Sequence, residues 1–250
     1  MLAKRLPTIL SEMTLDEGLE TTQIHSVAGI LPPNKFFVGT RPFRSPHHTI
    51  SDAALLGGGT NPSPGEISLA HNGVLFMDEL PEFRRNVLEV LRLPMEDGAV
   101  TVARVANTVT YPAKFMLVGA MNPCPCGHFT DPKRECHCSP LKIQSYLSKI
   151  SGPLLDRIDI HLEVPRLKYE HLTDKRRGEP SDEIRRRVDK AREVQKHRYK
   201  KDGIIFNAHL ESKELERYCV LDKEAEELLK LAILELGISA RAYDLSLIHI

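Results

Sequence analysis

Gly73-Val74-Leu75-Phe76-Met77-Asp78-Glu79 joins an unbroken apolar run to two adjacent carboxylates. A strand that helices cover on both faces reads as continuously apolar, whereas a half-exposed strand alternates. In open α/β sheets, ligands bind beyond the carboxyl ends of the strands. The sequence therefore predicts an α/β fold in which a parallel sheet is flanked by helices, with Asp78 and Glu79 at the mouth of a site.

The order of the two acids indicates how they would act in phosphoryl transfer. In such a pair, the first acid holds Mg²⁺ and the second positions the attacking water. We therefore assign the metal to Asp78 and the water to Glu79. The alternative is that both acids only close a core strand and open the following helix, whose first turn favours acids. A second apolar run, Phe115–Met121, ends in Asn122. Two parallel strands that each end in a polar residue favour one shared site.

Further blocks of sequence follow in a fixed order around these two strands. They are Arg41-Pro-Phe-Arg-Ser-Pro-His-His48, Pro64-Gly-Glu-Ile-Ser-Leu-Ala-His71, Asn122-Pro-Cys-Pro-Cys-Gly127 and Ser151-Gly-Pro-Leu-Leu-Asp-Arg-Ile-Asp159. With the two strands, which look like Walker B and sensor 1, they resemble the ComM/YifB group of magnesium-chelatase-like AAA+ ATPases from Met1 to about Asp244. The resemblance implies an AAA+ P-loop NTPase core with a small C-terminal helical lid, using Mg-ATP.

The same resemblance implies roles for three more residues. Asn122 corresponds to sensor 1, Arg157 to an arginine finger that reaches the neighbouring subunit's nucleotide, and Arg241 to sensor 2 on the lid. A guanidinium suits the finger because it stays charged and grips phosphate oxygens in a fork. The alternative for Arg157 is an ion pair with Asp156 or Asp159.

The resemblance further implies a homo-hexameric ring motor that acts on DNA as a helicase or translocase, in recombination or natural transformation. Two alternatives remain open at this point: a chelatase-like ATPase that remodels a protein partner, and a non-catalytic, zinc-stabilised fragment. The last is considered because no G-x-x-x-x-G-K-[ST] motif occurs among the 250 residues. We therefore expect the chain to begin just after its Walker A segment, and to bind ATP poorly by itself.

The expected domains are a core over residues 1–165 with a Cys-rich insert at 122–140, a linker at 166–180, and a helical lid at 181–250 that is truncated at its end. Lysine and arginine total 34, as do aspartate and glutamate, so any contact with DNA must be local. The sequence has no run of about 18 apolar residues, so no membrane partner is expected. Because the N-terminus lacks the apolar core of a signal peptide, we expect a cytoplasmic protein.

Four of the five cysteines, Cys124, Cys126, Cys136 and Cys138, lie in one short stretch. Zinc prefers four thiolates in a tetrahedron, and a short loop has too little core to order itself, so the pattern favours a structural zinc. The C-x-C spacing is tighter than usual, however, and reduced thiols without metal are the alternative. His128 and His137 could replace a cysteine as ligands.

Several elements are predicted from periodicity alone. A helix is expected from Pro81 to Pro94, a β-hairpin over Val100–Val109 with Arg104 as its basic residue, and a strand over Ile158–Val164. The resemblance implies a hairpin here that, as in related ring motors, lines a central pore; the alternative is that it simply packs on the domain. Ser181 is predicted to cap a helix that buries an apolar stripe of Ile184, Val188, Ala191 and Val194. Its other side would expose a basic surface that either meets DNA or is merely solvated.

Overall fold

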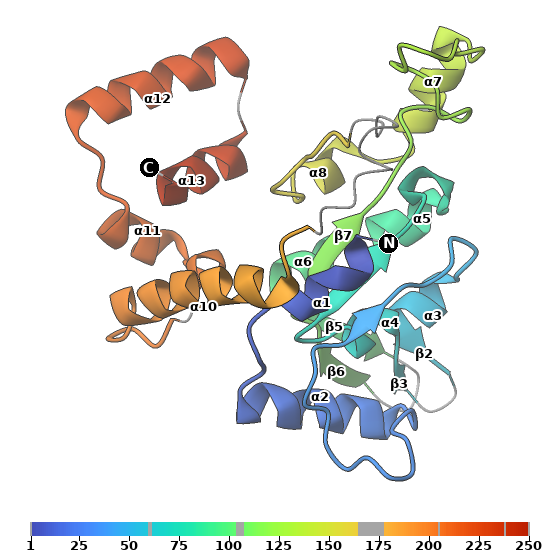
Figure 1. Ribbon diagram of the computed structural model, residues 1–250, viewed down its shortest axis with the longest axis vertical. Helices are drawn as coiled ribbons and strands as arrows, with labels where there is room; N and C mark the ends of the chain where they lie inside the picture. Colours follow the sequence, from blue (N-terminus) through green and yellow to red (C-terminus); the bar gives the residue numbers. More distant parts are fainter. Residues whose placement is uncertain are drawn as a thin grey trace. The chain divides into compact units, whose positions relative to one another are not determined.

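The computed structural model describes residues 2–59, 62–103, 108–164, 178–204, 206–237 and 239–249. The chain separates into two compact units, the first built around Met1–Leu155 and the second comprising Asp156–Glu163 with Gly178–Ile250 (Figure 1). The hairpin tip with Arg104 and most of the linker expected at 166–180 lie outside the described residues. Within these residues, no helix is long and apolar enough to cross a membrane.

The first unit consists of short elements. Its strands are β1 (Phe43–Arg44), β2 (Gly57–Gly58), β3 (Ser63–Pro64), β4 (Val74–Met77), β5 (Ala99–Ala103), β6 (Thr108–Pro112) and β7 (Met116–Gly119). Its helices are α1 (Leu6–Ile9), α2 (Leu15–Val27), α3 (Asp52–Leu56), α4 (Glu66–Leu69), α5 (Arg85–Glu89), α6 (Arg92–Asp97), α7 (Pro140–Leu147) and α8 (Gly152–Leu155), with 3-10 turns η1 (Ala3–Arg5) and η2 (Leu80–Glu82).

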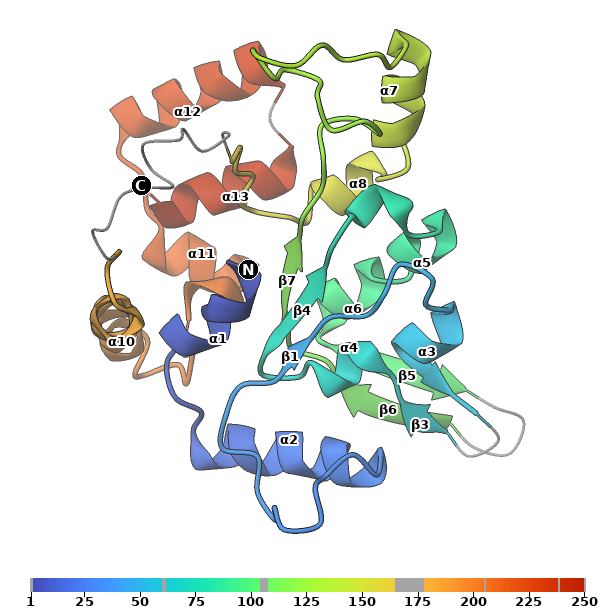
Figure 2. The ribbon, with the colours of Figure 1, turned by 45° about the vertical axis from the view of Figure 1, so that its right-hand side comes forward.

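A parallel sheet in the order β1-β4-β7 lies inside the first unit (Figure 2). Phe43 pairs with Val74, and the β4–β7 register runs from Val74 opposite Met116 to Met77 opposite Gly119. The two apolar runs predicted as strands are therefore parallel neighbours, and helices flank them, so the predicted α/β class is confirmed. The hairpins β2–β3 and β5–β6 are antiparallel.

The buried core lies on one side of β4. Leu75 and Met77 are completely buried, and they join a cluster with residues of α3 to α6, α8 and the β5–β6 stem. On the other side, the Phe76 ring stacks on Phe43 with their centroids 6.0 Å apart. β7 is less protected than its apolar sequence predicts, since Met116 is 42% exposed. The cause is its place at an edge of the described sheet.

The helix predicted from Pro81 to Pro94 is broken into η2, α5 and α6. Its predicted apolar face is correct, because Phe83, Val87, Leu88 and Leu91 are all buried. Pro94 does not end the helix but lies in the first turn of α6, where a backbone N–H has no intrahelical partner to lose. The helix ends instead at Gly98, whose left-handed backbone (φ 63°) caps it.

The predicted strand over Ile158–Val164 is wrong, because this segment is irregular and Ile160, Leu162 and Val164 are 74%, 83% and 75% exposed. Alternation assigns residues to two faces, but a strand also needs a neighbour to accept its hydrogen bonds. The hairpin over Val100–Val109 is confirmed by β5 and β6. Val100 and Val102 are buried in the core, so the described stem packs on the domain.

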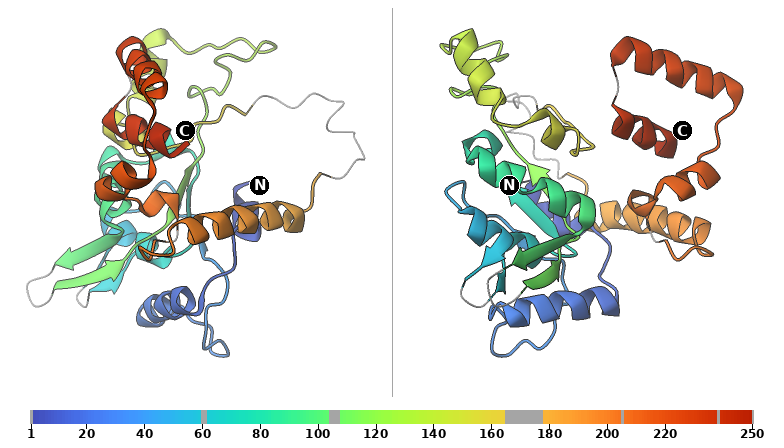
Figure 3. Two further views of the ribbon diagram at one scale, coloured as in Figure 1. Left: turned by 90° about the vertical axis from the view of Figure 1, so that its left-hand side faces the viewer. Right: turned by 180° about the vertical axis from the view of Figure 1, so that it is seen from behind.

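The second unit is helical. Its elements are α10 (Ser181–Arg198), η3 (Asn207–His209), α11 (Ser212–Tyr218), α12 (Lys223–Leu236) and α13 (Ala240–His249), shown from two sides in Figure 3. Gly237 ends α12 in a left-handed conformation (φ 62°, ψ 38°). Ser239 begins α13 by accepting the Ala242 backbone N–H on its hydroxyl at 3.3 Å. Glycine after the end of a helix and serine before the start of one are typical residues at these positions.

The inner face of α10 differs from the predicted stripe. Val194 is 53% exposed and Ala191 is also exposed, whereas Tyr199, one residue beyond the helix, is buried. The Tyr199 hydroxyl donates to Asn207 Oδ1 at 2.9 Å, and Arg192 lies over the Phe206 ring at 4.3 Å. The aromatic residues that follow the helix therefore set which side turns inward. Ser181 is the first helical residue and provides no cap.

Candidate functional site

The carboxyl ends of β4 and β7 are fastened together beyond their last paired residues. The Ala120 N–H donates to Met77 O at 3.0 Å, and the Leu80 N–H donates to Ala120 O at 2.9 Å. Asp78 and Glu79 stand between these two bonds, while Asn122 follows Ala120 by two residues. The structure thus delivers the acid pair and the asparagine at one edge of the sheet, as their places after two parallel strands predict.

Glu79 has a left-handed backbone (φ 54°, ψ 48°), which is unfavourable for a residue with a side chain. Two contacts support this conformation: Asp78 Oδ1 accepts the Glu79 N–H at 3.1 Å, and Glu79 O accepts the Glu82 N–H at 2.7 Å. Such a conformation costs about 1–3 kcal/mol and persists where the surroundings enforce it, often at functional sites. It turns the chain sharply and leaves both carboxylates exposed.

His48, which lies in the segment after β1, contacts the acid pair. Its Nδ1 is 3.6 Å from Glu79 Oε2. The His48 ring lies 4.1 Å from the His47 ring and meets the edge of Phe83 at 6.4 Å, measured between centroids. All three parallel strands therefore lead into the same site. The sequence block that ends in His48 gives no sign of this contact with Glu79.

Tyr146 of α7 reaches the same edge of the sheet and is 4% exposed. Burial raises the pKa of Tyr146, and the carboxylates of Glu82 and Glu79 raise it further, while a hydrogen bond from the Asn122 backbone opposes the shift. Lys149, one turn later, lies 3.8 Å from Glu82. Nothing in the sequence marks Tyr146, because its position depends on how the Cys-rich insert folds back.

Arg41 and Arg44, at the start of the parallel sheet, both bind acidic side chains of this chain. Arg41 has an almost buried side chain (8% exposed) and binds Glu17 at 3.1 Å, together with the Ser11 and Asn72 carbonyls. Arg44 donates to both oxygens of Glu66, at 2.7 and 2.6 Å. Both arginines thus fasten β1 to its surroundings.

The four clustered cysteines converge. Cys124 Sγ lies 3.3 Å from Cys126 Sγ and 3.7 Å from Cys136 Sγ, and the sulfurs of all four, with Cys138, are within 4.8 Å of one another. Burial disfavours a thiolate at Cys124, but hydrogen bonds from the Phe129 backbone and neighbouring thiols outweigh it and lower its pKa to about 6. At Cys136, the Cys138 backbone lowers the pKa, but burial and the adjacent thiols raise it to about 12.

Arg157 and Arg241 both belong to the second unit. Arg241 donates from Nε and Nη2 to Asp159 Oδ1, at 3.3 and 3.2 Å. Of the two aspartates considered as partners for Arg157, Asp159 is therefore engaged by Arg241. Arg157 is half-buried in the turn after α8.

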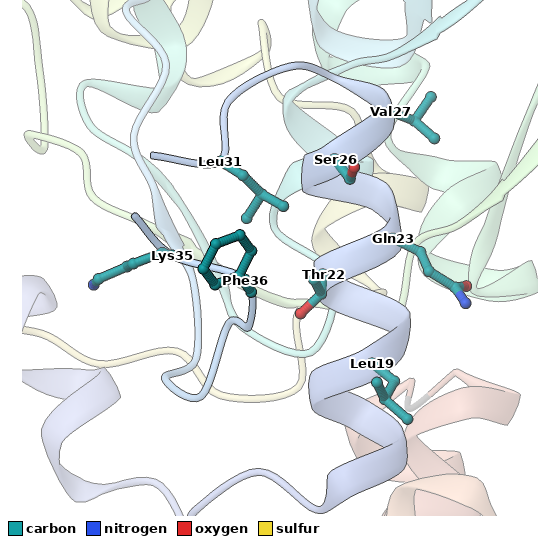
Figure 4. A pocket seen from close by; sticks show the side chains of 8 residues that line it. All are labelled: Leu19, Thr22, Gln23, Ser26, Val27, Leu31, Lys35 and Phe36. Atoms are coloured by element: carbon teal, nitrogen blue, oxygen red, sulfur yellow. The ribbon is translucent and has the colours of Figure 1, made fainter. Parts of the chain in front are cut away.

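An open groove lies elsewhere, between α2 and the segment that follows it. Leu31 and Phe36 point from this segment toward Thr22 of α2 (Figure 4). Lys35 is the one charged residue among those lining the groove. The groove therefore lacks the carboxylates that phosphoryl transfer uses, and we assign it no catalytic role.

Two family models match the chain. That of magnesium chelatase subunit ChlI matches residues 1–172, and that of the ChlI C-terminal region matches residues 178–247. Competence protein ComM of Haemophilus influenzae is 47% identical over 247 residues, and protein YifB of Escherichia coli is 44% identical over 246. These alignments cover 97% and 98% of this chain and 47% of each relative. The chain thus spans about half the length of these curated relatives.

A shorter similarity extends to magnesium-chelatase subunit ChlI of Mesostigma viride. It is 37% identical over 60 residues, which is 24% of this chain and 17% of that protein.

Proposed function

Because the chain belongs to the magnesium chelatase ChlI family, in the group of ComM and YifB, we propose that it forms part of an ATP-hydrolysing AAA+ motor. The observation that carries this proposal is the fastening of β4 to β7, which holds Asp78 and Glu79 next to the segment that leads to Asn122. Exposed carboxylates at the carboxyl end of a buried parallel strand fit a phosphoryl-transfer site.

The donor set fits Mg-ATP, because carboxylate oxygens are the hard ligands that Mg²⁺ prefers. When bound, Mg²⁺ neutralises charge on the phosphate oxygens. Asp78 would hold the ion, Glu79 orients the attacking water, and the Asn122 amide steadies that water or a phosphate oxygen. These 250 residues contain no Walker A motif, so in this proposal the segment works together with a phosphate-binding loop outside it.

His48 acts on Glu79 as a positioning residue. At 3.6 Å from Glu79 Oε2, its ring limits where the carboxylate can point, and His47 and Phe83 hold the ring in turn. The side chain of Glu79 is 56% exposed, so few other contacts restrain it. The pairing therefore selects one orientation of the water-orienting carboxylate.

Arg157 would serve the nucleotide of a neighbouring subunit, and Arg241 the nucleotide of its own subunit from the helical lid at 181–250. Asp159 supports the lid assignment, since it holds Arg241 in a defined orientation through two hydrogen bonds. A side chain that is 47% exposed remains available for a ligand. The core at 1–165 and the linker at 166–180 complete the proposed organisation.

The proposed assembly is a cytoplasmic homo-hexamer that moves DNA as a helicase or translocase. The name of the relative, competence protein ComM, favours DNA over a protein substrate. The described part of α10 adds basic side chains such as Arg186 and Lys196, both exposed. If a protein partner were the substrate instead, ATP turnover would respond to that protein and not to single-stranded or branched DNA.

The test uses a protein extended to include its phosphate-binding loop. Glu79→Gln alone and Arg157→Ala alone should each abolish turnover, with the finger contributing about 10³-fold or more. Mixed together, the two variants should regain part of the activity, because some interfaces then combine an intact Glu79 with an intact Arg157. Absence of recovery in demonstrated mixed rings contradicts the assignment across subunits, and normal turnover of Arg157→Ala removes it from the mechanism.

The role of His48 is tested in the same extended protein. His48→Gln should lower kcat while leaving KM for ATP nearly unchanged, because it alters the orientation of Glu79 and no phosphate contact. His47→Gln is the matched control and should have the smaller effect, since His47 does not contact Glu79. Equal kinetics of His48→Gln and the parent protein would contradict the positioning role.

A further inference from the structure

The four sulfurs of Cys124, Cys126, Cys136 and Cys138 have the separation that one tetrahedral metal ion requires. A zinc–sulfur bond of about 2.3 Å places the sulfurs of a regular tetrahedron about 3.8 Å apart. The described distances of 3.3, 3.6 and 3.7 Å, with every pair within 4.8 Å, are close to this value. A disulfide needs about 2.0 Å, so these thiols are not bonded to one another.

The chain between Asn122 and Ser139 has little else to hold it. This stretch contains neither helix nor strand, and Cys124 is its one buried residue, with 0% exposure. Gly127 and Thr130 turn the chain back with positive φ angles of 77° and 74°. A loop of this composition buries too little apolar surface to offset the entropy of ordering it. A bound metal would supply the missing stabilisation.

The surroundings of Cys124 suit a metal-bound thiolate. The Phe129 N–H donates to Cys124 Sγ at 3.3 Å. Backbone donors of this kind orient and support sulfur ligands in metal sites.

We propose that these four cysteines bind one zinc ion, and that the ion fixes Asn122 at the end of β7. Zinc fits better than an iron–sulfur cluster, because sulfurs that surround a multinuclear cluster lie much farther apart than 4.8 Å. The connection between the proposed ion and Asn122 is short, since Cys124 is two residues from Asn122. The last of the four ligands, Cys138, directly precedes Ser139, whose hydroxyl accepts the Lys142 N–H and caps α7.

The segment that carries the four cysteines, residues 122–139, is also held at its far end, through α7. Tyr146 of this helix is buried, and the Asn122 backbone lies close enough to act on its hydroxyl, so both ends of the insert meet beside Asn122. One ion thus stabilises the arm that carries Asn122 and the helix that covers it. That Asn122 matters for turnover rests on the proposed ATPase function, whereas the metal site itself does not.

Metal content of this chain is the first test. Purified protein should contain about one equivalent of zinc, and Co²⁺ substituted for it should give the intense visible absorption of a tetrahedral tetrathiolate. Cys126→Ser and Cys136→Ser should lose that absorption. Cys219→Ser is the matched control, because this fifth cysteine lies in the second unit. The Cys219→Ser protein should retain the ion. Protein prepared under reducing conditions without any metal, or with stoichiometric iron, overturns the assignment.

Hydrogen exchange tests the link to Asn122 without any need for catalysis. Removing zinc with a chelator should speed exchange of amides between Met121 and Cys126 by about tenfold or more, which corresponds to about 1.4 kcal/mol. The amides of β4, Val74–Met77, should change far less. If the two regions change equally or neither changes, zinc does not hold the Asn122 arm. ATP turnover that fails in zinc-loaded extended protein would contradict the proposed function and leave the metal site standing.

Discussion

Replacing Gly73 by alanine should destabilise the first unit, although alanine is normally the more stable residue within a strand. A Cβ at Gly73 would lie 2.2 Å from Pro42 O and 2.8 Å from both Pro42 N and Cδ. Ordinary contacts between such atoms are about 3.5 Å. The segment that leads into β1 would therefore have to move away from β4 by about 1 Å.

The size of the effect follows from the same atoms. Pro42 O accepts the Val74 N–H at 2.8 Å, and a shift of about 1 Å breaks this bond. An unsatisfied buried N–H costs about 1–3 kcal/mol, and overpacking costs about 1–3 kcal/mol more. Alanine recovers only about 0.4–1 kcal/mol by restricting the unfolded chain. The net expectation is a loss of about 1–6 kcal/mol.

Native-state hydrogen exchange at the β4 amides is the suitable assay, because a chain with two compact units need not unfold in one step. Gly152→Ala is the matched control, since a Cβ there meets nothing within 4 Å. It should leave stability unchanged or raise it by up to about 1 kcal/mol. If Gly73→Ala exchanges as slowly as the parent protein, the close approach of Pro42 does not constrain β4 and the reasoning fails.

Arg41→Lys should lower the free energy of unfolding by about 2–4 kcal/mol although the charge is kept. A single ammonium cannot reach Glu17 and both of the backbone carbonyls that the planar guanidinium joins. Urea unfolding followed at α2 measures the loss, and stability equal to that of the parent protein would refute the prediction. Burial lowers the pKa of His71 below its usual 6.5, and it outweighs the Glu20 carboxylate, which lies 3.1 Å from Nε2 and raises the pKa, while Nδ1 accepts the Lys114 N–H at 3.0 Å. The stability that neutral His71 contributes is therefore complete above pH 6.5 and declines as the pH falls toward the lowered pKa. His71→Asn should flatten that part of the stability profile, and an identical acid-side profile in the variant would contradict it.

The central strands and their polar ends could be predicted from the sequence because both features are local. The apolar run before Asp78 and the one before Asn122 leave few arrangements other than neighbouring buried strands, and the structure pairs them in parallel. His48 and Tyr146 could not be predicted in the same way. Their positions beside Glu79 depend on the paths of irregular segments, which no periodicity encodes.

Two of the wrong predictions share a physical cause. Alternation over Ile158–Val164 describes a strand, but no neighbour within the described residues supplies its hydrogen bonds. The stripe on α10 was predicted from apolar residues alone, whereas buried Tyr199 and its bond to Asn207 determine the inner face. In both segments, tertiary partners override local pattern.

The stem of the β5–β6 hairpin shares its core with the strand that carries the acid pair. Val100, Val102 and Tyr111 lie in the same buried cluster as Leu75 and Met77. Close-packed interiors compress little and transmit strain. A substitution that changes the packing of Val100, Val102 or Tyr111 should therefore also displace β4, the strand that ends at the acid pair.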